Sequence, residues 1–503
     1  MANISLLCTD AAGHLFPLCS LGQELRRRGH QLQIVSREPA RALCERFGFP
    51  LQTLPPAEPV QSRISIIDGL ASVTRLPQPL NFLRRNIQRI EATFSAGPAL
   101  LKQTSPDLIL SDQLTVTAGT IAEHLQIPHV SVSESLFWHW ESPLPPFYSH
   151  HGYANSNWSR LKNRVSQQLW TVYMRPWLAR INHQRRIWKL PTITTIEQLF
   201  SPLAHLVQLT PDLDFPRQQL PSTVHYVGAL SSQRMTDLLG PKIADSHRDR
   251  ANSALVSALD HLRAEAEKSA TKLAQQTKLV PQTKPAPQAK LAPQACSSGA
   301  SFPWEQLDGR PLIYASVGTV YKPKNPAVLR TIAAACAPLN AQLVLTKGQW
   351  KEDDCDPRGL LRDLPGKPLL VEFAPQLELL QHARLLVTHA GMNTVLEALS
   401  LGVPMVALPC NADQPGIAAR VEHAGVGLRS SYHRPNVTQL RQQIERVLSE
   451  SQFRERAVRL QRSLWQAGGV HRAADLVEQV LRTGQPVLRE TTSTDRRRVV
   501  EGS

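Results

Sequence analysis

Short apolar segments alternate with longer amphipathic segments along most of the chain. The first apolar segment, ISLLCT (Ile4–Thr9), precedes an amphipathic stretch from about Pro17 to Arg28, and QLQIVS (Gln31–Ser36) follows. Gly29 stands where a helix commonly ends, because glycine adopts the left-handed backbone of a C-terminal cap without a steric penalty. The pattern predicts a β-α-β unit with parallel strands, and it leaves His14 in the loop before the helix.

The same alternation continues through both halves of the chain. In the first half, we predict further strands at residues 107–112, 129–133, 205–210 and 223–230. In the second half, we predict strands at residues 311–317, 341–346, 368–373, 383–388 and 403–409, with helices at 326–337, after Gly416 and over 438–483. Strands that alternate with helices predict the α/β class, here as two doubly wound Rossmann-like domains over residues 1–234 and 301–484.

Residues 235–300 differ from both predicted domains in composition. A charged, helix-compatible segment leads into KLVPQTKPAPQAKLAPQA, a repeat of proline, glutamine, lysine and alanine. Such a sequence is too polar to bury a core, so we predict a mobile, extended linker inserted between the domains. Residues 485–503, which include three consecutive arginines, are predicted to form a disordered basic tail.

Composition narrows the class of protein. The chain has 503 residues, of which 42% are hydrophobic, enough for two domains with separate cores. Its seven cysteines show no CxxC pair and no metal-binding spacing, which is typical of reduced thiols in a cytoplasmic protein. The first residues lack a basic leader, and no apolar run approaches the ~20 residues of a membrane-spanning helix. We therefore expect a cytoplasmic protein.

The formal net charge of +15 is concentrated in one region. Between Glu141 and Glu197 there is no acidic residue, whereas eight basic residues lie there: Arg160, Lys162, Arg164, Arg175, Arg180, Arg185, Arg186 and Lys189. Six tryptophans lie in or beside the same region: Trp138, Trp140, Trp158, Trp170, Trp177 and Trp188. No nucleic-acid-binding motif accompanies this charge, so we expect no nucleic-acid partner. Two compatible interpretations stay open, a helical wall over an apolar pocket with a solvated basic face, or a contact with an anionic membrane surface.

The most informative motif is VTHAGMNTVLEALSLGVPMVALPCNADQ, from Val387 to Gln414. His389 and Gly391 follow its first strand, and Asn393 and Thr394 open the helix that comes next. Unpaired N–H groups and the helix dipole make that position an anion site, and glycine lets a diphosphate approach the backbone. Glu397, one turn later, and Asp413-Gln414, after the next strand, suit sugar hydroxyls, which donate well to such acceptors. The motif predicts binding of a nucleotide-linked sugar.

Together with FAPQ at Phe373–Gln376, this motif resembles the donor-binding signature of inverting glycosyltransferases in the UDP-glucuronosyltransferase-like family. The resemblance implies the GT-B fold, in which two Rossmann-like domains face a cleft. It also implies a UDP-dependent hexosyltransferase. Such an enzyme would move a hexose, above all glucose, from a UDP-sugar to a hydroxyl of a lipophilic small molecule of the carotenoid, macrolide, sterol or polyphenol type. The resemblance implies neither a metal nor another cofactor.

The resemblance also assigns roles to individual donor-binding residues. Phe373, with Ala374 beside it, stands where plant relatives carry the tryptophan that stacks on uracil, and a phenyl ring offers a smaller stacking area. The residues implied to hold the ribose are Gln376 and Glu397, and those implied to hold the sugar hydroxyls are Asp413 and Gln414. The residues implied to stabilise the diphosphate without a metal are Ser316, Thr319, His389, Gly391, Asn393 and Thr394.

His14 and Asp112 are the candidate catalytic residues. An imidazole with its usual pKa of about 6.5 suits a general base, and His14 lies where the family carries its catalytic histidine. Asp112 ends the predicted strand LILSD, where relatives keep a carboxylate that orients the histidine; the alternative for Asp112 is a helix N-cap. Many retaining enzymes carry two glutamates in the donor region, and His389 replaces the first of them. We therefore expect inversion, with a β-glycoside formed from an α-linked donor.

Two acidic motifs are interpreted as structural. Asp212-Leu-Asp214 matches the DxD of metal-dependent sugar transferases, but the flanking prolines predict a surface turn there. Glu352-Asp353-Asp354 is interpreted as a solvated charge run. No Gly-x-Gly-x-x-Gly follows a strand, so the sequence offers no support for nicotinamide chemistry.

Two further functions stay open from the sequence. One is transfer to a membrane glycolipid by an enzyme that docks on the bilayer through its basic, tryptophan-rich region, which would place the protein peripherally at the membrane. The other is a non-catalytic protein that binds sugar nucleotides on the same fold. The joint presence of His14 and Asp112 argues against the non-catalytic alternative.

Overall fold

The computed structural model describes residues 1–56, 77–230, 302–318, 327–347 and 361–489, and of residues 77–82 it describes the backbone alone. Several features singled out from the sequence lie outside the described residues: the linker over 235–300, the arginines of the basic tail, Thr319 and the run Glu352–Asp354. What was predicted for them stays a prediction. Within the described residues, the cysteines are all free, and no helix combines the length and the apolar character needed to span a bilayer.

The first half of the chain folds around a seven-stranded, wholly parallel sheet in the order β3-β2-β1-β4-β5-β6-β7. Its strands are β1 (Asn3–Leu7), β2 (Gln31–Ser36), β3 (Leu51–Thr53), β4 (Leu108–Asp112), β5 (His129–Ser133), β6 (His205–Val207) and β7 (Val224–Tyr226). Its α-helices are α1 (Ala12–Arg27), α2 (Arg41–Phe47), α4 (Pro77–Thr104), α5 (Ala118–Leu125) and α6 (Asn157–Ile187). The central strands are buried along almost their whole length, which explains why they appear in the sequence as continuous apolar runs.

The second half folds around a six-stranded parallel sheet in the order β10-β9-β8-β11-β12-β13. Its strands are β8 (Leu312–Ser316), β9 (Gln342–Thr346), β10 (Leu369–Val371), β11 (Ala383–Thr388), β12 (Met405–Ala407) and β13 (Gly427–Arg429). Its α-helices are α10 (Ala327–Cys336), α12 (Gln376–His382), α13 (Met392–Ser400), α14 (Gln414–His423), α15 (Val437–Ser449) and α16 (Ser451–Gln466), and α17 (Gly469–Thr483) follows. The strand order reverses once in each sheet, so the predicted doubly wound α/β fold is confirmed.

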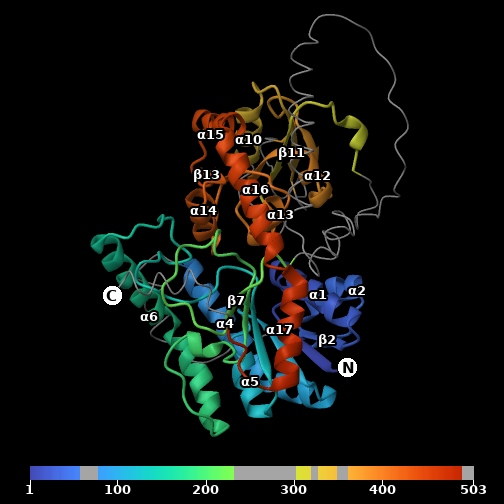
Figure 1. The fold of residues 1–503 in the computed structure, drawn as a ribbon, viewed down its shortest axis with the longest axis vertical. Helices are drawn as coiled ribbons and strands as arrows, with labels where there is room; N and C mark the ends of the chain where they lie inside the picture. Colours follow the sequence, from blue (N-terminus) through green and yellow to red (C-terminus); the bar gives the residue numbers. More distant parts are fainter. Residues whose placement is uncertain (57–76, 231–301, 319–326, 348–360, 490–503) are drawn as a thin grey trace, which may run out of the picture. The chain divides into compact units, whose positions relative to one another are not determined.

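Helices cover both faces of the first sheet (Figure 1). Successive residues of a strand point to opposite faces. Accordingly, Leu6 of β1 lies in a core with Leu18 of α1. Leu7, the next residue, lies in a separate core with Trp177 of α6. The two short edge strands β3 and β13 were not predicted.

Helix α17 packs against the first sheet, although the sequence analysis placed it in the second domain. Its apolar residues in the core beside β1 include Ala473, Ala474, Leu476, Val477 and Val480. Charge reinforces the contact, because Arg28, which directly follows α1, pairs with Asp475 at 2.7 Å and with Glu478 at 2.9 Å. The structure therefore differs here from the predicted domain limit at residue 484. The amphipathic pattern shows that a helix has an apolar stripe, but not which sheet that stripe covers.

The prediction that His14 lies in a loop before a helix starting near Pro17 is wrong. Helix α1 begins at Ala12, and His14 occupies its first turn. Pro17 lies inside the helix and has no N–H, so the carbonyl of Gly13, four residues earlier, lacks its helical donor. The side chain of Asn393, from the second half of the chain, donates to this carbonyl at 2.9 Å instead. The proline thus frees an acceptor for a contact between the two halves.

The prediction that Asp214 lies in a surface turn is also wrong. Its carboxylate is buried and accepts hydrogen bonds from Arg217 Nε at 2.6 Å and from Arg420 Nε at 2.7 Å. The hydroxyl of Tyr226 donates a third, at 2.7 Å. Burial by itself raises the pKa of Asp214, but the charges of Arg217 and Arg420 hold it well below its usual range. Because Arg420 belongs to α14, Asp214 links the connection between β6 and β7 to the second half of the chain.

Replacing Asp214 with asparagine is expected to destabilise the fold. The change leaves Arg217 and Arg420 buried without their main counter-charge, which typically costs about 3–5 kcal/mol of unfolding free energy. Tyr226→Phe is the matched control, because it removes one hydrogen bond worth about 1 kcal/mol and keeps both ion pairs. Urea and thermal unfolding followed by circular dichroism would measure both variants. An Asp214→Asn variant as stable as Tyr226→Phe would contradict the assigned role.

Candidate active site

Three side chains from three neighbouring parts of the first sheet meet at its carboxyl edge. His14 follows β1, Asp112 ends β4 and Glu134 directly follows β5. His14 Nδ1 lies 3.5 Å from Asp112 Oδ2 and 3.3 Å from Glu134 Oε2. The strand order reverses between β1 and β4, and ligands of doubly wound sheets bind at that point. The structure therefore brings the two candidate catalytic residues together and adds a third.

Asp112 is buried and held by four donors. Its Oδ2 accepts the backbone N–H of Thr9 at 3.3 Å and the Thr9 hydroxyl at 3.0 Å. Its Oδ1 accepts the backbone N–H of Thr115 at 2.8 Å and the Thr115 hydroxyl. Donors to a carboxylate favour its charged form. The N-cap residue of α5 is Thr117, so Asp112 is not the helix N-cap that the sequence left open.

Sequence reasoning missed Glu134, which is 2% exposed. The available signal was its position directly after the apolar segment HVSVS, since a residue that follows a parallel strand lies at the carboxyl edge of the sheet. Its proximity to Asp112 depends on the pairing of β5 with β4, which the sequence does not reveal. Glu134 Oε1 is buried and has no hydrogen-bond partner among the described residues.

The groups of this cluster change one another's protonation. Burial alone lowers the pKa of His14, but the hydrogen bond with Glu134 and the charges of Glu134, Asp112 and Asp413 raise it to about 9. Burial, aided by the charge of Asp112, raises the pKa of Glu134 to about 8 against the opposing effect of His14. Together these shifts retain an extra proton on the His14–Glu134 pair at neutral pH. The effect of Asp413 also places a carboxylate implied to hold the sugar within electrostatic reach of His14.

Both carboxylates face the same ring nitrogen of His14. Hydrogen bonding to them holds a proton on Nδ1, which leaves Nε2 as the nitrogen that can accept another. The His14 side chain is 19% exposed, whereas those of Asp112 and Glu134 are almost wholly buried. Of these three groups, the imidazole is therefore the one placed to meet a substrate.

The same cluster carries donor atoms that metal ions use. His14 Nδ1 and one oxygen from each carboxylate lie within 4.8 Å of one another, and elsewhere in the described residues no such group of three occurs. Both oxygens of Asp112 are already occupied by donors from Thr9 and Thr115. We therefore expect the cluster to hold a shared proton rather than a metal ion.

The second sheet presents a corresponding edge between β8 and β11, where its strand order reverses. Ser316 ends β8 and His389 follows β11, and the backbone N–H of His389 donates to the Ser316 carbonyl at 3.4 Å. Helix α13 begins at Met392, with Gly391 as its N-cap. The first N–H groups of a helix have no acceptor within it, so this end of α13 has the properties of an anion site.

Two glycines make room for the ring of His389. A Cβ on Gly391 would lie 2.5 Å from His389 Nε2, and one on Gly318 would lie 2.8 Å from the same atom. Gly318 also has a φ of 88°, a backbone conformation that favours glycine. Burial lowers the pKa of His389, with partial opposition from the Ser316 backbone and the charge of Asp413. A neutral imidazole at this position can donate a hydrogen bond to a phosphate oxygen.

Gln376, Thr394 and Glu397 form one hydrogen-bonded group between α12 and α13. Gln376 Nε2 donates to Glu397 Oε2 at 2.5 Å and lies 3.5 Å from Thr394 Oγ1. The hydroxyl of Tyr314 donates to Gln376 Oε1 at 3.3 Å. Burial raises the pKa of Glu397 to about 7, although the hydrogen bond from Gln376 opposes the shift. The structure thus makes neighbours of the two residues that the resemblance assigns to the ribose.

Asp413 and Gln414 lie where β12 leads into α14. Gln414 Oε1 accepts the backbone N–H groups of Cys410 at 2.9 Å and Asn411 at 3.1 Å, so this side chain shapes the loop before the helix. Asp413 accepts a hydrogen bond from the hydroxyl of Ser135. Because Ser135 follows Glu134, this bond joins the donor motif to the loop that carries part of the His14 cluster.

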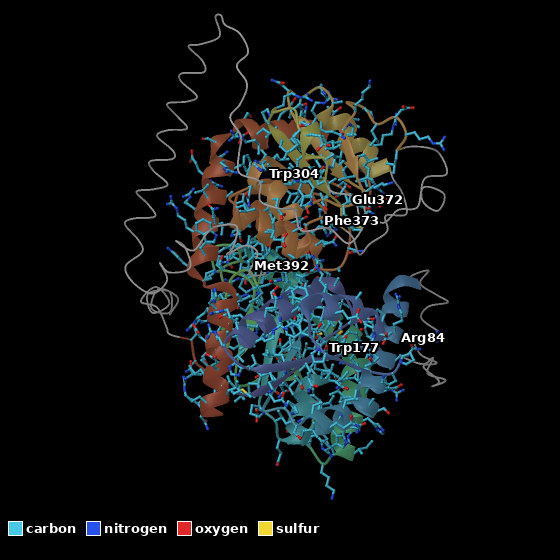
Figure 2. All side chains as sticks on the ribbon, turned by 90° about the vertical axis from the view of Figure 1, so that its right-hand side faces the viewer. Arg84, Trp177, Trp304, Glu372, Phe373 and Met392 are labelled. Carbon is cyan, nitrogen blue, oxygen red and sulfur yellow. The ribbon has the colours of Figure 1, made fainter. Side chains whose placement is uncertain are left out.

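Phe373 and Ala374 follow β10, and Figure 2 shows Phe373 beside Glu372 in the second domain. Phe373 is half-buried, which leaves part of its ring accessible for stacking. Ala374 packs against the core that contains Leu379 and Leu380 of α12. The stacking role of Phe373 stays a prediction.

Gln208 and Asn393 connect the two edges through their side chains. Gln208 is buried just after β6, and its amide donates to the Glu134 carbonyl and, at 2.8 Å, to Asn393 Oδ1. Asn393 in turn donates to the Gly13 carbonyl, next to His14. Asn393, which is implied to bind the diphosphate, is therefore bonded directly to the segment of His14 and, through Gln208, to the segment of Glu134. Sequence reasoning missed Gln208, because a single glutamine after a short strand has no distinctive pattern.

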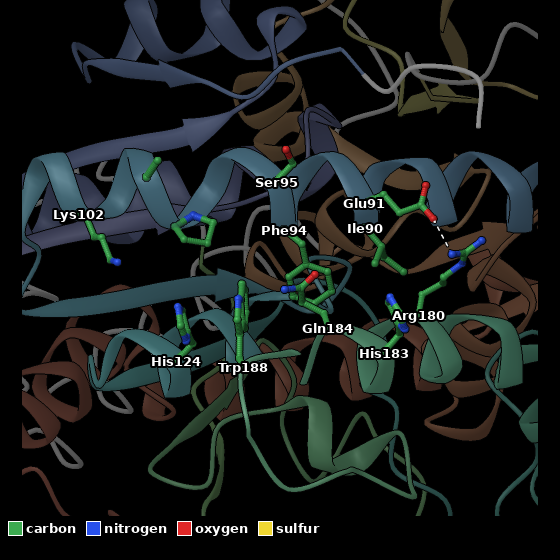
Figure 3. Close-up of a pocket in the computed structure, with 12 residues that line it drawn as sticks. Ile90, Glu91, Phe94, Ser95, Lys102, His124, Arg180, His183, Gln184 and Trp188 are labelled. Carbon is green, nitrogen blue, oxygen red and sulfur yellow. Dashed lines mark ion pairs between the residues drawn. The ribbon is translucent and has the colours of Figure 1, made fainter. Parts of the chain in front are cut away.

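Two sizeable cavities lie in the first half of the chain, away from these residues. One of about 510 Å³ lies between α4 and α6 (Figure 3), and one of about 670 Å³ lies beside β5, β6 and the loop after α6. His14, Asp112 and Glu134 line neither cavity. Sheet topology and hydrogen bonds, rather than a cavity, therefore locate the candidate reacting groups.

Comparison with known proteins bears on the family resemblance and on the fold. Residues 304–492 match the model of the family described as UDP-glucoronosyl and UDP-glucosyl transferase. A zeaxanthin glucosyltransferase of Pantoea ananas is 27% identical and covers 97% of this chain and 98% of its own length. A second zeaxanthin glucosyltransferase, of Pseudescherichia vulneris, is 25% identical and covers 97% of this chain and 100% of its own length. The solved structure of the glycotransferase of kitacinnamycin matches with a TM-score of 0.63 and is 22% identical in sequence. The match covers 95% of this chain and 99% of that structure's chain. These matches confirm the family resemblance and the GT-B fold.

Replacing Glu134 with glutamine is expected to lower the pKa of His14. The variant keeps the size of the side chain and removes a charge that, with that of Asp112, favours the imidazolium. We expect the midpoint of the His14 titration to fall from about 9, by about 1 to 3 pH units. NMR of protein labelled at the histidine nitrogens, with the His14 signal assigned from a His14→Gln variant, measures the midpoint.

The matched control for this titration is Glu123→Gln, since Glu123 pairs with Arg185 at 2.7 Å outside the cluster. It should leave the midpoint of His14 unchanged. Equal midpoints in the wild type and in Glu134→Gln would show that the carboxylate does not govern the imidazole.

Proposed function

We propose that this chain, a glycosyltransferase of the UDP-glucoronosyl and UDP-glucosyl transferase family, transfers glucose from UDP-glucose to a hydroxyl of a lipophilic small molecule, most specifically a carotenoid. No metal ion or other cofactor takes part. The observation that carries the proposal is the contact of His14 Nδ1 with Asp112 and Glu134 at the edge of the first sheet. The ordered donor motif at the edge of the second sheet supports it.

The reaction is a single displacement with inversion. The acceptor oxygen attacks the anomeric carbon, while the bond from that carbon to the β-phosphate oxygen breaks and its electron pair leaves with UDP. The acceptor proton passes to Nε2 of His14 and from there to solvent. An α-linked donor therefore gives a β-glycoside, UDP and one proton.

The carboxylates make His14 an effective base once its Nε2 is free of a proton. Asp112 and Glu134 hold Nδ1–H, so they fix the tautomer and stabilise the imidazolium that forms when Nε2 accepts the acceptor proton. Asp112 is the partner with the more fixed position, because four donors hold its two oxygens. Glu134 is the more adjustable partner, because its second oxygen is unpaired.

The start of α13 receives the diphosphate. Its free N–H groups and the neutral imidazole of His389 offset the charge that develops on the leaving group, which removes the need for a metal. The other residues proposed to bind the diphosphate are Ser316, Thr319, Gly391, Asn393 and Thr394. The remaining donor contacts are proposed as Phe373 and Ala374 for uracil, Gln376 and Glu397 for ribose, and Asp413 and Gln414 for the hexose.

The relatives and the packing of the first half favour an apolar acceptor. Both zeaxanthin glucosyltransferases align with nearly the whole chain, including the half that carries His14. Trp138 contacts Trp170 of α6, with ring centres 6.2 Å apart, and Phe147 contacts Trp170 at 5.1 Å. Trp138 and Phe147 belong to the loop that starts with Glu134, so aromatic rings share a loop with one partner of the proposed base. A carotenoid presents its hydroxyl at the end of such an apolar body.

Incubation with UDP-glucose and zeaxanthin tests the reaction and the base together. We expect UDP release, a product heavier by one hexose for each transfer, and the β-anomer by proton NMR. His14→Ala is expected to lower kcat by about 10²–10⁴-fold, the usual contribution of a general base, with the Kd for UDP nearly unchanged. Turnover within about threefold of the wild type would rule out His14 as the base. UDP binding without transfer to any carotenoid, macrolide, sterol or polyphenol would favour the non-catalytic alternative.

Removal of metal ions is expected to leave the transfer rate unchanged, because the N–H groups at the start of α13 and the neutral imidazole of His389 stabilise the leaving diphosphate. The measurement compares initial rates after dialysis against EDTA with rates after re-addition of Mg²⁺ or Mn²⁺. A metal-dependent sugar transferase treated in parallel is the positive control. If EDTA abolished transfer, one ion restored it and Glu134→Gln lost that ion, the His14 cluster would be a metal site instead.

A further inference from the structure

Helix α6 exposes most of the large apolar side chains that the described residues leave in solvent. Six of the ten such side chains lie on this helix: Trp158, Leu161, Val165, Leu169, Val172 and Ile187. Trp158 is 73% exposed and Leu169 is 65% exposed. Exposed large apolar groups are usually scattered, so this concentration on one element indicates a contact surface.

The six side chains lie along one side of the helix. At 100° per residue, their positions fall within a sector of about 80°, and exposed Ala179 and His183 continue the line between Val172 and Ile187. The helix has 31 residues, which corresponds to a length of about 45 Å. We call this side of the helix the α6 stripe. A largely apolar line of this length fits an extended partner.

Basic side chains flank the α6 stripe. Arg164, Arg175 and Arg186 recur every eleven residues, which is close to three full turns, so they form a row beside the stripe. All three are exposed, and within the described residues none of them is in an ion pair. The helix contains no acidic residue. The charge of this surface is therefore complementary to an anionic partner.

The opposite side of α6 is anchored in the protein. Met174, Trp177 and Ile181 are buried in the core that lies on one face of the first sheet. Arg185 is buried as well and pairs with Glu123 of α5. Because this inner side is already packed, a partner can approach only from the side of the α6 stripe, and the helix would lie parallel to the partner's surface.

The cavity beside the C-terminal half of α6 also combines apolar and basic side chains, as the α6 stripe and its flanking arginines do (Figure 3). Phe94 of α4 and Trp188 supply apolar rings to its wall, and the basic or ionisable groups there are Lys102, His124, Arg180 and His183. Its acidic residue, Glu91, is paired with Arg180 at 3.2 Å. Apolar rings next to cationic groups suit a molecule with an apolar chain and an anionic head.

We propose that the α6 stripe and its flanking arginines dock this chain on the surface of an anionic lipid bilayer. Apolar side chains enter the boundary between headgroups and acyl chains, while the arginines meet the lipid phosphates. A second copy of the chain is a poorer occupant, because two copies meeting through this side would bring their arginine rows together. Docking goes beyond the proposed reaction and does not depend on it. Docking would bring the enzyme to the lipid bilayer, in which a lipophilic acceptor dissolves.

Density-gradient flotation of the full chain tests the proposal without any acceptor. We expect the wild type to float at low salt with vesicles of phosphatidylcholine and phosphatidylglycerol, and not with phosphatidylcholine alone. The double variant Leu161→Gln/Leu169→Gln and the triple variant Arg164→Gln/Arg175→Gln/Arg186→Gln should each bind about tenfold more weakly or worse. Leu488→Gln, at a leucine that is 62% exposed outside α6, is the matched control and should float like the wild type.

Three outcomes would overturn the proposal. The first is failure of the wild type to float with anionic vesicles at low salt. The second is flotation of both α6 variants at the wild-type level, with loss of binding only when Arg496, Arg497 and Arg498 are replaced by glutamine. The third is a dimer in solution, measured by light scattering, that Leu161→Gln/Leu169→Gln converts to a monomer. Circular dichroism of each variant checks that a loss of binding is not a loss of fold.

Discussion

Parallel pairing places the carboxyl ends of all strands at one edge of each sheet, and both candidate sites depend on that constraint. β1, β4 and β5 lie close together, so the residues after them meet even though His14 and Glu134 are 120 positions apart. β8 and β11 do the same for Ser316 and His389. The order of the strands assembles the reacting groups, and the local motifs only supply them.

The need to compensate buried charge is met in three different ways. Asp214 is held by two arginines and a tyrosine, and Asp112 by four donors from two threonines, so both oxygens of each carboxylate are paired. Glu134 has the imidazole of His14 and one unpaired oxygen. Fully paired carboxylates stabilise structure, whereas an incompletely paired one beside a histidine can exchange a proton. Asp214, which joins the two halves, is therefore suited to a structural role, whereas Glu134 and His14 are suited to proton transfer.

Contacts between the two halves use side chains that the donor would also meet. Asn393 bonds to Gln208 and to the Gly13 carbonyl, and Asp413 bonds to Ser135. In the proposed function, donor binding and the association of the halves would share these groups. On the far side of the first sheet, α6 divides its tryptophans between two tasks, since Trp177 is buried in the core and Trp158 is exposed beside basic residues. The two interpretations of this basic region are thus compatible, because they concern opposite sides of one helix.

Apolar periodicity determined the α/β class, both parallel sheets and most strand positions, because strands buried on both faces are apolar along their length. The motif from His389 to Gln414 also allowed donor residues to be predicted, because its parts are close in sequence, and their roles stay predictions. Four features needed the tertiary structure: the sheet that α17 covers, the burial of Asp214, the place of Pro17 inside α1, and the position of Glu134 beside His14. Apolar periodicity shows that one side of a helix or strand is buried, but not which other part of the chain packs against it. Partners that are distant in sequence decide that, and only the packed chain brings them together.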